Sequence, residues 1–188
     1  MSHRLPNLYS KLMDVRWNRS GFCDRIKMMR QERPRHPIIT GLIAGFLGTA
    51  AMTVAMELMF PFLPRRQQRP LPPRQITGRI AVKTGVRPYL DEDDVLAATM
   101  LAHFGYGSVA GSVYTLSVER LSLPVPLKGT IFGLGVWAGS YYGWVPGLRL
   151  FPPASQWPRG RKLLMVAAHL VWGVTLATVV ERLCHSRS

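Results

Sequence analysis

Four stretches of the chain are almost free of charged residues, and each is long enough to cross a bilayer as a helix. They cover approximately residues 38–60, 94–118, 127–148 and 163–184. Roughly 20 apolar residues suffice for a helix to span the hydrocarbon core. The pattern therefore predicts an all-α fold, in which residues 37–184 form an integral membrane domain of four transmembrane helices.

The segments outside these stretches are polar and mostly basic. Residues 1–36 form a basic N-terminal extension, which could be an interfacial amphipathic helix or a loosely ordered tail. The connection 61–93 is rich in proline and arginine, and its spacing predicts a surface helix over about 72–85. The acidic run 91–94 precedes the second stretch, where carboxylates cap free helical amides.

The second and fourth stretches resemble one another. Each places a histidine among apolar residues, in "AHFGYG" (102–107) and "AHLVWG" (168–173), and each ends in a Glu-Arg-Leu triplet, 119–121 and 181–183. Because the connections after the second and third stretches are short, consecutive helices should be antiparallel. We therefore expect a four-helix antiparallel bundle of two pseudo-repeated helical hairpins.

Small residues recur at helical spacing in the first three stretches. This spacing lets helix backbones approach closely in lipid, where no hydrophobic force drives helices together. The glycines expected to pack helices, within the chain or against another subunit, are Gly41, Gly45, Gly48, Gly107, Gly111, Gly129, Gly133 and Gly139.

The charge distribution separates this chain from basic nucleic-acid-binding proteins. The net charge is +14 over 188 residues, but the basic residues gather at the ends and in the connections. This segregation favours a membrane protein with basic flanks and no nucleic-acid partner. The side of the bundle that holds the N-terminus carries 13 of the 24 Lys and Arg residues, which leans towards a cytoplasmic N-terminus. Two cysteines, Cys23 and Cys184, do not make a disulfide framework.

Both histidines should lie near the middle of the bilayer. At 1.5 Å per residue, His103 and His169 are each roughly 12–14 Å from the same face of the bundle. Glu57 lies near that end of the first stretch, and Tyr141 and Tyr142 lie near that end of the third. Ionisable groups inside a membrane usually face the bundle interior and are candidate functional groups.

Four interpretations of this polar cluster stay open. The histidines could form structural hydrogen bonds between helices, or carry a proton or ion path that begins at Glu57. They could both ligate the iron of haem b, with the glycine four residues after each leaving room for the porphyrin. A metal site of both histidines with Glu57 is a further alternative. No cofactor is predicted outright, haem b being the alternative.

Several short motifs resemble those of the YagU-like bacterial inner-membrane proteins, a family of unknown function. They are "GLIAG" (41–45), "PLPPR" (70–74), "LAHFGYG" (101–107), "LKG" (127–129), "FPP" (151–153), Trp157 and "AAHLVW" (167–172). The resemblance implies a multi-pass protein of the cytoplasmic membrane with no assigned enzymatic activity. It also marks His103, Trp157, His169 and Trp172 as family-like positions.

The leading functional hypothesis is a structural or accessory subunit that packs against a larger membrane complex or against itself. No nucleophile–base pair, phosphate loop or zinc spacing suggests a hydrolase or a transferase. The alternative is a redox or ion-handling protein that uses His103 and His169.

Overall fold

The computed structural model describes residues 34–119 and 121–185, which belong to one compact unit spanning 32–188. The described part contains five helices of twelve residues or more and no strand, so the predicted all-α class is confirmed. The predicted N-terminal interfacial helix, like Cys23, lies outside the described residues.

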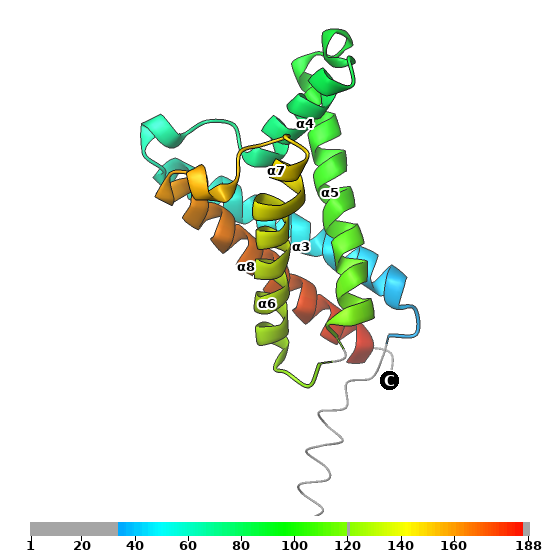
Figure 1. Ribbon diagram of the computed structural model, residues 1–188. Helices are drawn as coiled ribbons and strands as arrows, with labels where there is room; N and C mark the ends of the chain where they lie inside the picture. The colour runs from blue at the N-terminus through cyan, green and yellow to red at the C-terminus, as the bar shows by residue number, and fades with distance from the viewer. Residues whose placement is uncertain (1–33, 120, 186–188) are drawn as a thin grey trace, which may run out of the picture. The chain divides into compact units, whose positions relative to one another are not determined.

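Four long helices and one shorter helix overlap the predicted stretches (Figure 1). They are α3 (Pro37–Met59), α4 (Pro72–Lys83), α5 (Glu92–Ser117), α6 (Val125–Ala138) and α8 (Arg159–His185). All except α6 begin and end within a few residues of the predicted stretches. Proline at the first or second position of α3, α4 and α6 suits the first turn of a helix, where the amide has no helical acceptor.

The third stretch is not one regular α-helix. Helix α6 ends at Ala138 and is followed by a π-helical segment, η4 (Gly139–Trp144), and by the short α7 (Val145–Gly147). Gly143 has non-helical dihedral angles (φ −105°, ψ −108°), and Pro146 has no amide hydrogen to donate one turn back. These residues interrupt the α-helical ladder that the apolar pattern alone would continue.

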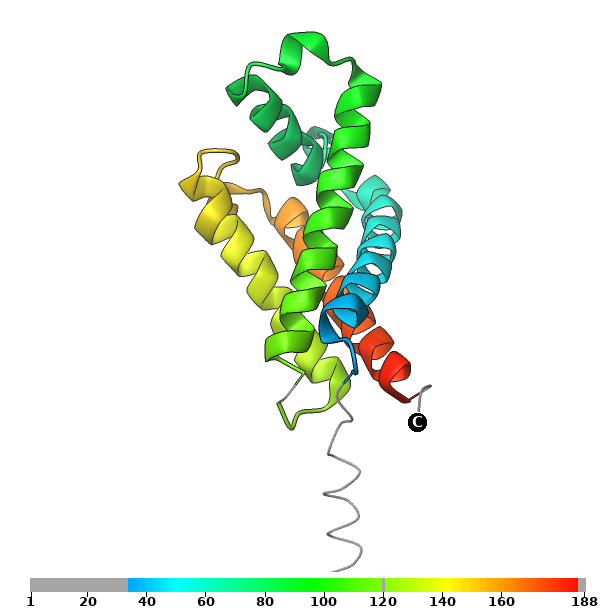
Figure 2. The same cartoon turned by 90° about the vertical axis from the view of Figure 1, so that its right-hand side faces the viewer.

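The helices pack as two antiparallel pairs. Helix α3 packs along α5, α6 packs along α8, and α3 also packs on α8, which joins the pairs. Helix α4 lies against α5. Helices α5 and α6 are not closely packed on one another, and Figure 2 shows them diverging towards the end of the bundle at which α4 lies.

Glycines make the closest contacts in both pairs. Between α3 and α5, a Cβ at Gly41 would lie 2.5 Å from the carbonyl oxygen of Gly111, and one at Gly45 would overlap the carbonyl of Gly107. Between α6 and α8, Gly129 faces Gly173 in the same way. The glycine surfaces are therefore occupied inside the chain.

The remaining predicted packing glycines differ from one another. Gly133 lies against the carbonyl oxygen of His169, and Gly48 lies against Trp172. Gly139, in contrast, has no atom of another element within 4 Å of the position its Cβ would take, so it packs no helix. Gly173 was not among the predicted packing positions.

The acidic run caps α5. The Asp91 carboxylate accepts a hydrogen bond from the backbone amide of Asp94 (2.8 Å), and the Asp94 carboxylate accepts one from the amide of Asp91 (3.1 Å). Glu92 forms ion pairs with Arg74 of α4 and with Arg87. The hydrogen bond from Arg74 and the charge of Arg87 lower the pKa of Glu92. The run therefore starts α5 and ties it to α4.

Two helices of the described part satisfy length and composition criteria for crossing a membrane. They are residues 37–62, which cover α3 and the turn after it, and residues 159–184 of α8. This is weak evidence of a membrane location, because a core helix of a soluble protein can meet the same criteria.

Candidate binding site at the histidine cavity

A cavity of about 280 Å³ lies between α5 and η4, with further walls from α3, α4 and α8. We call it the histidine cavity. Its lining comes from α3, α4, α5, α6, η4, α7 and α8, and most of it is apolar. The polar side chains along it belong to Thr49, Thr77, Thr99, His103, Tyr106, Ser140, Tyr141 and His169. The two predicted histidines thus lie on one cavity although 66 positions separate them in the chain.

His169 is held by its own helix. Its Nδ1 lies 2.8 Å from the carbonyl oxygen of Met165, one turn earlier in α8. A carbonyl oxygen can only accept, so Nδ1 carries the hydrogen and Nε2 is left with its lone pair. The ring also meets that of Tyr141 edge to face, with centroids 6.0 Å apart. His169 therefore has a fixed orientation and an accepting nitrogen.

His103 has a buried nitrogen without a partner. Its Nε2 forms no hydrogen bond within the described part of the chain. Buried polar atoms are usually paired, so an exception asks for an explanation such as a ligand, an ion or water. His103 also lines a neighbouring cavity of about 240 Å³, together with Glu57. His103 is therefore the ionisable side chain among the three residues, Pro73, Thr99 and His103, that line both cavities.

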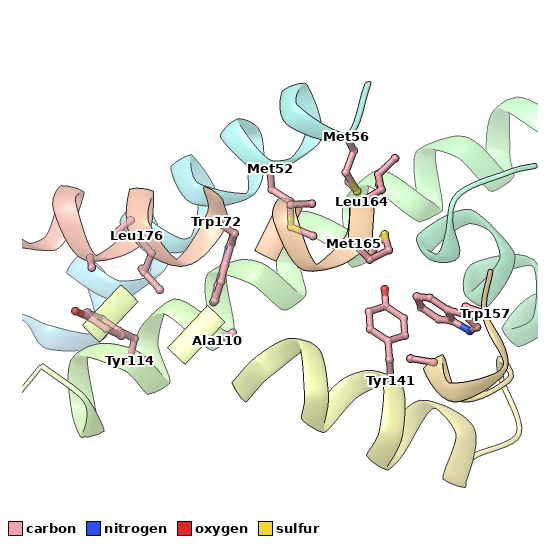
Figure 3. Packing of buried hydrophobic residues seen from close by; sticks show 14 of the residues in the cluster. Met52, Met56, Ala110, Tyr114, Tyr141, Trp157, Leu164, Met165, Trp172 and Leu176 are labelled. Carbon is pink, nitrogen blue, oxygen red and sulfur yellow. The ribbon is translucent and has the colours of Figure 1, made fainter. Parts of the chain in front are cut away.

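The two tyrosines of the predicted cluster separate. Tyr141 is buried, lines the histidine cavity, and packs on Trp157 with ring centroids 4.7 Å apart (Figure 3). Tyr142 is 49% exposed and packs against Trp137 instead. Glu57 is exposed and reaches only the neighbouring cavity. The π-helical segment places Ser140 and Tyr141 on the cavity and Tyr142 outside it.

Aromatic side chains close two sides of the cavity. The hydroxyls of Tyr106 (α5) and Ser140 (η4) lie 2.9 Å apart, and the Tyr106 ring packs on Trp144. On the inner side, the Trp172 indole donates to the hydroxyl of Thr49 (3.2 Å). These contacts bridge α5 to η4 and α8 to α3. The sequence did not indicate Tyr106 or Ser140, because their pairing depends on how α5 and η4 lie in the folded bundle.

The geometry bears on the cofactor alternatives. Gly107 lines the histidine cavity and packs against Thr49 and Trp172, whereas Gly173 packs against Gly129 and is not part of the lining. Gly173 therefore leaves no room beside the cavity, and the haem interpretation stays a prediction. In the described residues no three histidine, cysteine or acidic side chains are grouped so that they could hold a metal ion, so the structure does not assemble the His103, His169 and Glu57 site.

A buried charged cluster, which was not predicted, lies where α5 ends and α6 begins. Lys128 of α6 is fully buried, and its ammonium donates to the backbone carbonyl of Glu119 (3.2 Å). Its charge also interacts with the carboxylates of Glu119 and Glu181. These glutamates belong to the two Glu-Arg-Leu triplets. The repetition of that triplet was the sequence feature that could have indicated the cluster. The contacts suit a structural tie between helix ends.

Comparison with known proteins gives a family and no further relative. The family model described as "Protein of unknown function (DUF1440)" matches residues 47–178, and the chain belongs to this family. None of the curated proteins or solved structures compared with the chain matched it. The matched segment includes both histidines and all four long helices α3, α5, α6 and α8 at least in part.

Proposed function

We propose that the chain is a four-span, multi-pass protein of the cytoplasmic membrane that binds a small, mainly apolar molecule in the histidine cavity. The binding function rests on one observation above all. A mainly apolar cavity holds two imidazoles, and one of them, His103, has a buried Nε2 without a partner. Ligand sites of small molecules commonly combine apolar walls with a few polar groups that orient the ligand.

The distribution of apolar side chains supports four spans. Large apolar residues face outward on all four long helices, including Leu58 on α3, Leu101 on α5, Ile131 on α6 and Leu163 on α8. Polar and charged side chains such as Lys128 are instead buried between the helices. This arrangement suits a lipid environment. The YagU-like resemblance and the slight excess of basic residues on the N-terminal side agree with a cytoplasmic membrane and a cytoplasmic N-terminus.

The chemistry of the cavity restricts the ligand. His169 offers an accepting Nε2, and His103 offers an Nε2 whose role depends on its tautomer. A molecule with an apolar ring or chain and one hydroxyl or carbonyl group satisfies both the walls and the unpaired nitrogen. Haem b is the redox alternative, because two imidazoles line one cavity, but it would have to fit without space at Gly173.

The binding proposal is tested by identifying what the purified protein carries. Wild-type protein and the Ala102→Phe variant are purified in mild detergent, extracted with organic solvent and compared by mass spectrometry. Ala102 lines the cavity, so phenylalanine there should fill it. Ala97→Phe, on an exposed part of the same helix away from the cavity, is the matched control.

Two outcomes decide the binding proposal. A molecule retained by wild type and Ala97→Phe but lost from Ala102→Phe supports it. The absence of any molecule enriched in wild type over Ala102→Phe contradicts it. A visible spectrum before and after dithionite separates haem from other ligands, since a Soret band lost in His103→Ala and His169→Ala would identify haem b.

The shared position of His103 favours a second candidate function, a proton path. His103 lines both the histidine cavity and the cavity that contains Glu57, so a route from Glu57 to His169 crosses this side chain. Vesicles that contain the protein and an internal pH-sensitive dye would measure proton flux. The path predicts flux in wild type and His36→Ala and a loss of flux in His103→Ala. Flux no higher than in protein-free vesicles rules the path out.

We also propose an accessory role beside other membrane subunits or a second copy of the chain. Because the glycines pack inside the chain, such a partner would contact outward apolar residues such as Leu101 and Val109 of α5. Cross-linking in native membranes followed by purification tests this role. A stoichiometric second polypeptide or a homodimer supports it, whereas recovery of the single chain contradicts it.

A further inference from the structure

A third cavity, of about 410 Å³, lies where α3 ends and α8 begins, and we call it the basic cavity. Its walls are the segment 65–70, α4, the connection 150–158 and the start of α8. Its lining contains Arg66, Arg69, Arg79 and Arg161 and no acidic residue. Four arginines thus line one cavity whose walls contain no acidic side chain.

Arg161 builds this cavity. It is 9% exposed, and its guanidinium donates to the carbonyl oxygens of Gln67 (2.9 Å), Arg69 (2.9 Å) and Pro70 (2.8 Å). Figure 1 shows the segment after α3 beside the start of α8, where these bonds form. Three of its five N–H donors are thus used on the backbone. Arg161 therefore fixes the segment that carries Arg66 and Arg69, and we assign ligand contact to the other arginines.

The other three arginines are available. Arg66, Arg69 and Arg79 are exposed, and none forms an ion pair with an acidic side chain in the described part of the chain. Glu92, at the start of α5, is already paired with Arg74 and Arg87. Guanidinium groups bind phosphate with paired hydrogen bonds, so a phosphate group would offset the gathered charge.

The surroundings favour the headgroup of a lipid. Phe151 and Trp157 line the basic cavity, and aromatic residues of this kind are enriched at the level of lipid headgroups. The cavity also lies at helix ends, where a bilayer places its phosphates. Basic pockets between helix ends are known to take anionic headgroups. The Tyr141–Trp157 pair stands between the two cavities, which share no lining residue.

We propose that the basic cavity binds the phosphate group of an anionic phospholipid headgroup through Arg66, Arg69 and Arg79. The site is independent of any ligand in the histidine cavity. It uses the charge of its arginines, whereas the histidine cavity is lined mainly by apolar side chains.

Titration calorimetry in mild-detergent micelles tests the site. The probes are a short-chain phosphatidylglycerol, a phosphatidylcholine with the same chains, and inorganic phosphate. The test variant carries Arg66→Gln, Arg69→Gln and Arg79→Gln. The control variant carries Arg65→Gln, Arg149→Gln and Arg159→Gln, three exposed arginines that do not line the cavity. Both triple variants change exposed side chains, and their melting temperatures are compared with wild type to check folding.

The expected result is a preference for phosphatidylglycerol over phosphatidylcholine that disappears in the test variant. Three lost cationic contacts should weaken binding by about tenfold or more, while the control variant stays within about threefold of wild type. Inorganic phosphate that binds as tightly and competes would support the phosphate site but assign it to a soluble anion. Equal phosphatidylglycerol affinity in the two triple variants would overturn the proposal, and His103→Ala should leave the affinity unchanged whatever the histidine cavity binds.

Discussion

At residue 45 the chain has no room for a side chain. A Cβ there would overlap the backbone carbonyl of Gly107, and backbone atoms of two packed helices cannot move aside as a flexible side chain can. We therefore expect Gly45→Ala to separate α3 from α5. The cost should be about 1–3 kcal/mol in the free energy of unfolding, as for other overpacked interiors. Denaturation with sodium dodecyl sulfate in mixed micelles measures it.

Gly105 supplies the matched control for that change. A Cβ there meets no atom within 4 Å, and the residue lies inside α5. Gly105→Ala should leave the stability unchanged or raise it by about 0.5–1 kcal/mol, because alanine favours the helix. If both changes had the same effect, helix propensity and not close packing would govern these positions.

Single residues also show where the sequence was sufficient and where it was not. The spacing of Gly41, Gly45, Gly107 and Gly111 indicates close helix contact, because small residues at this interval share one helix face. The spacing cannot say which helix they meet. Tyr141 and Tyr142 are adjacent in the sequence, which does not say which of them faces the interior; in η4 the first is buried and the second is exposed.

Helix α5 begins with a capping box whose contribution can be measured. Asp91 accepts a hydrogen bond from the amide of Asp94, and without it a helical amide loses its acceptor. Asp91→Ala should cost about 1 kcal/mol in the free energy of unfolding. Asp93→Ala, in the same exposed turn but outside the box, should cost much less. Equal losses would mean that the helix dipole, not the cap, sets the effect.

The corner between α4 and α5 should depend on pH. Glu92 precedes the predicted span 94–118, and its pairing with Arg74 and Arg87 lowers its pKa from the ordinary value of 4.5. The pairing therefore stabilises the corner above that pH and is lost as the pH falls through the lowered pKa. Protease cleavage in the connection 84–91 should accelerate in wild type as the pH falls below 4.5 and through the lowered pKa of Glu92. In Glu92→Gln, cleavage should already be fast at neutral pH. A wild-type cleavage rate that does not change with pH would contradict this prediction.

The connection between α3 and α4 depends on one side chain of α8. Arg161 donates to three carbonyl oxygens of the segment 67–70, and it is nearly buried. Hydrogen bonds from a charged donor are worth more than neutral ones, so Arg161→Gln should cost about 2 kcal/mol or more in the free energy of unfolding. Arg159→Gln, exposed and two residues earlier, is the control. An unfolding free energy as high in Arg161→Gln as in Arg159→Gln would contradict the clamp.

At the scale of the whole bundle, the sequence predicted the helices better than their role in the membrane. The apolar stretches place α3, α5 and α8 within a few residues of their ends. The third stretch breaks at Gly143 and Pro146, because hydropathy counts apolar residues and does not register a lost backbone donor. The matching motifs allowed the two histidines to be expected at the same depth in the bundle. The divergence of α5 and α6 beside the cavity comes from packing between distant segments, which the sequence does not indicate.

The number of spans can be measured, and it has the largest consequences, because in the described part of the chain two helices, α3 and α8, meet the length and hydropathy criteria. With four spans, Ser122 between α5 and α6 and Ser155 between α7 and α8 lie on opposite sides of the membrane. With two spans, both lie on the same side, because the whole of 63–158 would then stay on one face. Single cysteines at these exposed positions, in a chain whose Cys23 and Cys184 are replaced by serine, separate the two topologies.

We expect a membrane-impermeant thiol reagent to label Ser155→Cys in intact cells and Ser122→Cys only after the cells are permeabilised. That pattern follows from four spans with a cytoplasmic N-terminus, and the reversed pattern would keep four spans with the orientation inverted. Labelling of both cysteines from one side would reduce the spans to α3 and α8. Leu101 and Ile131 would then face water or a protein partner.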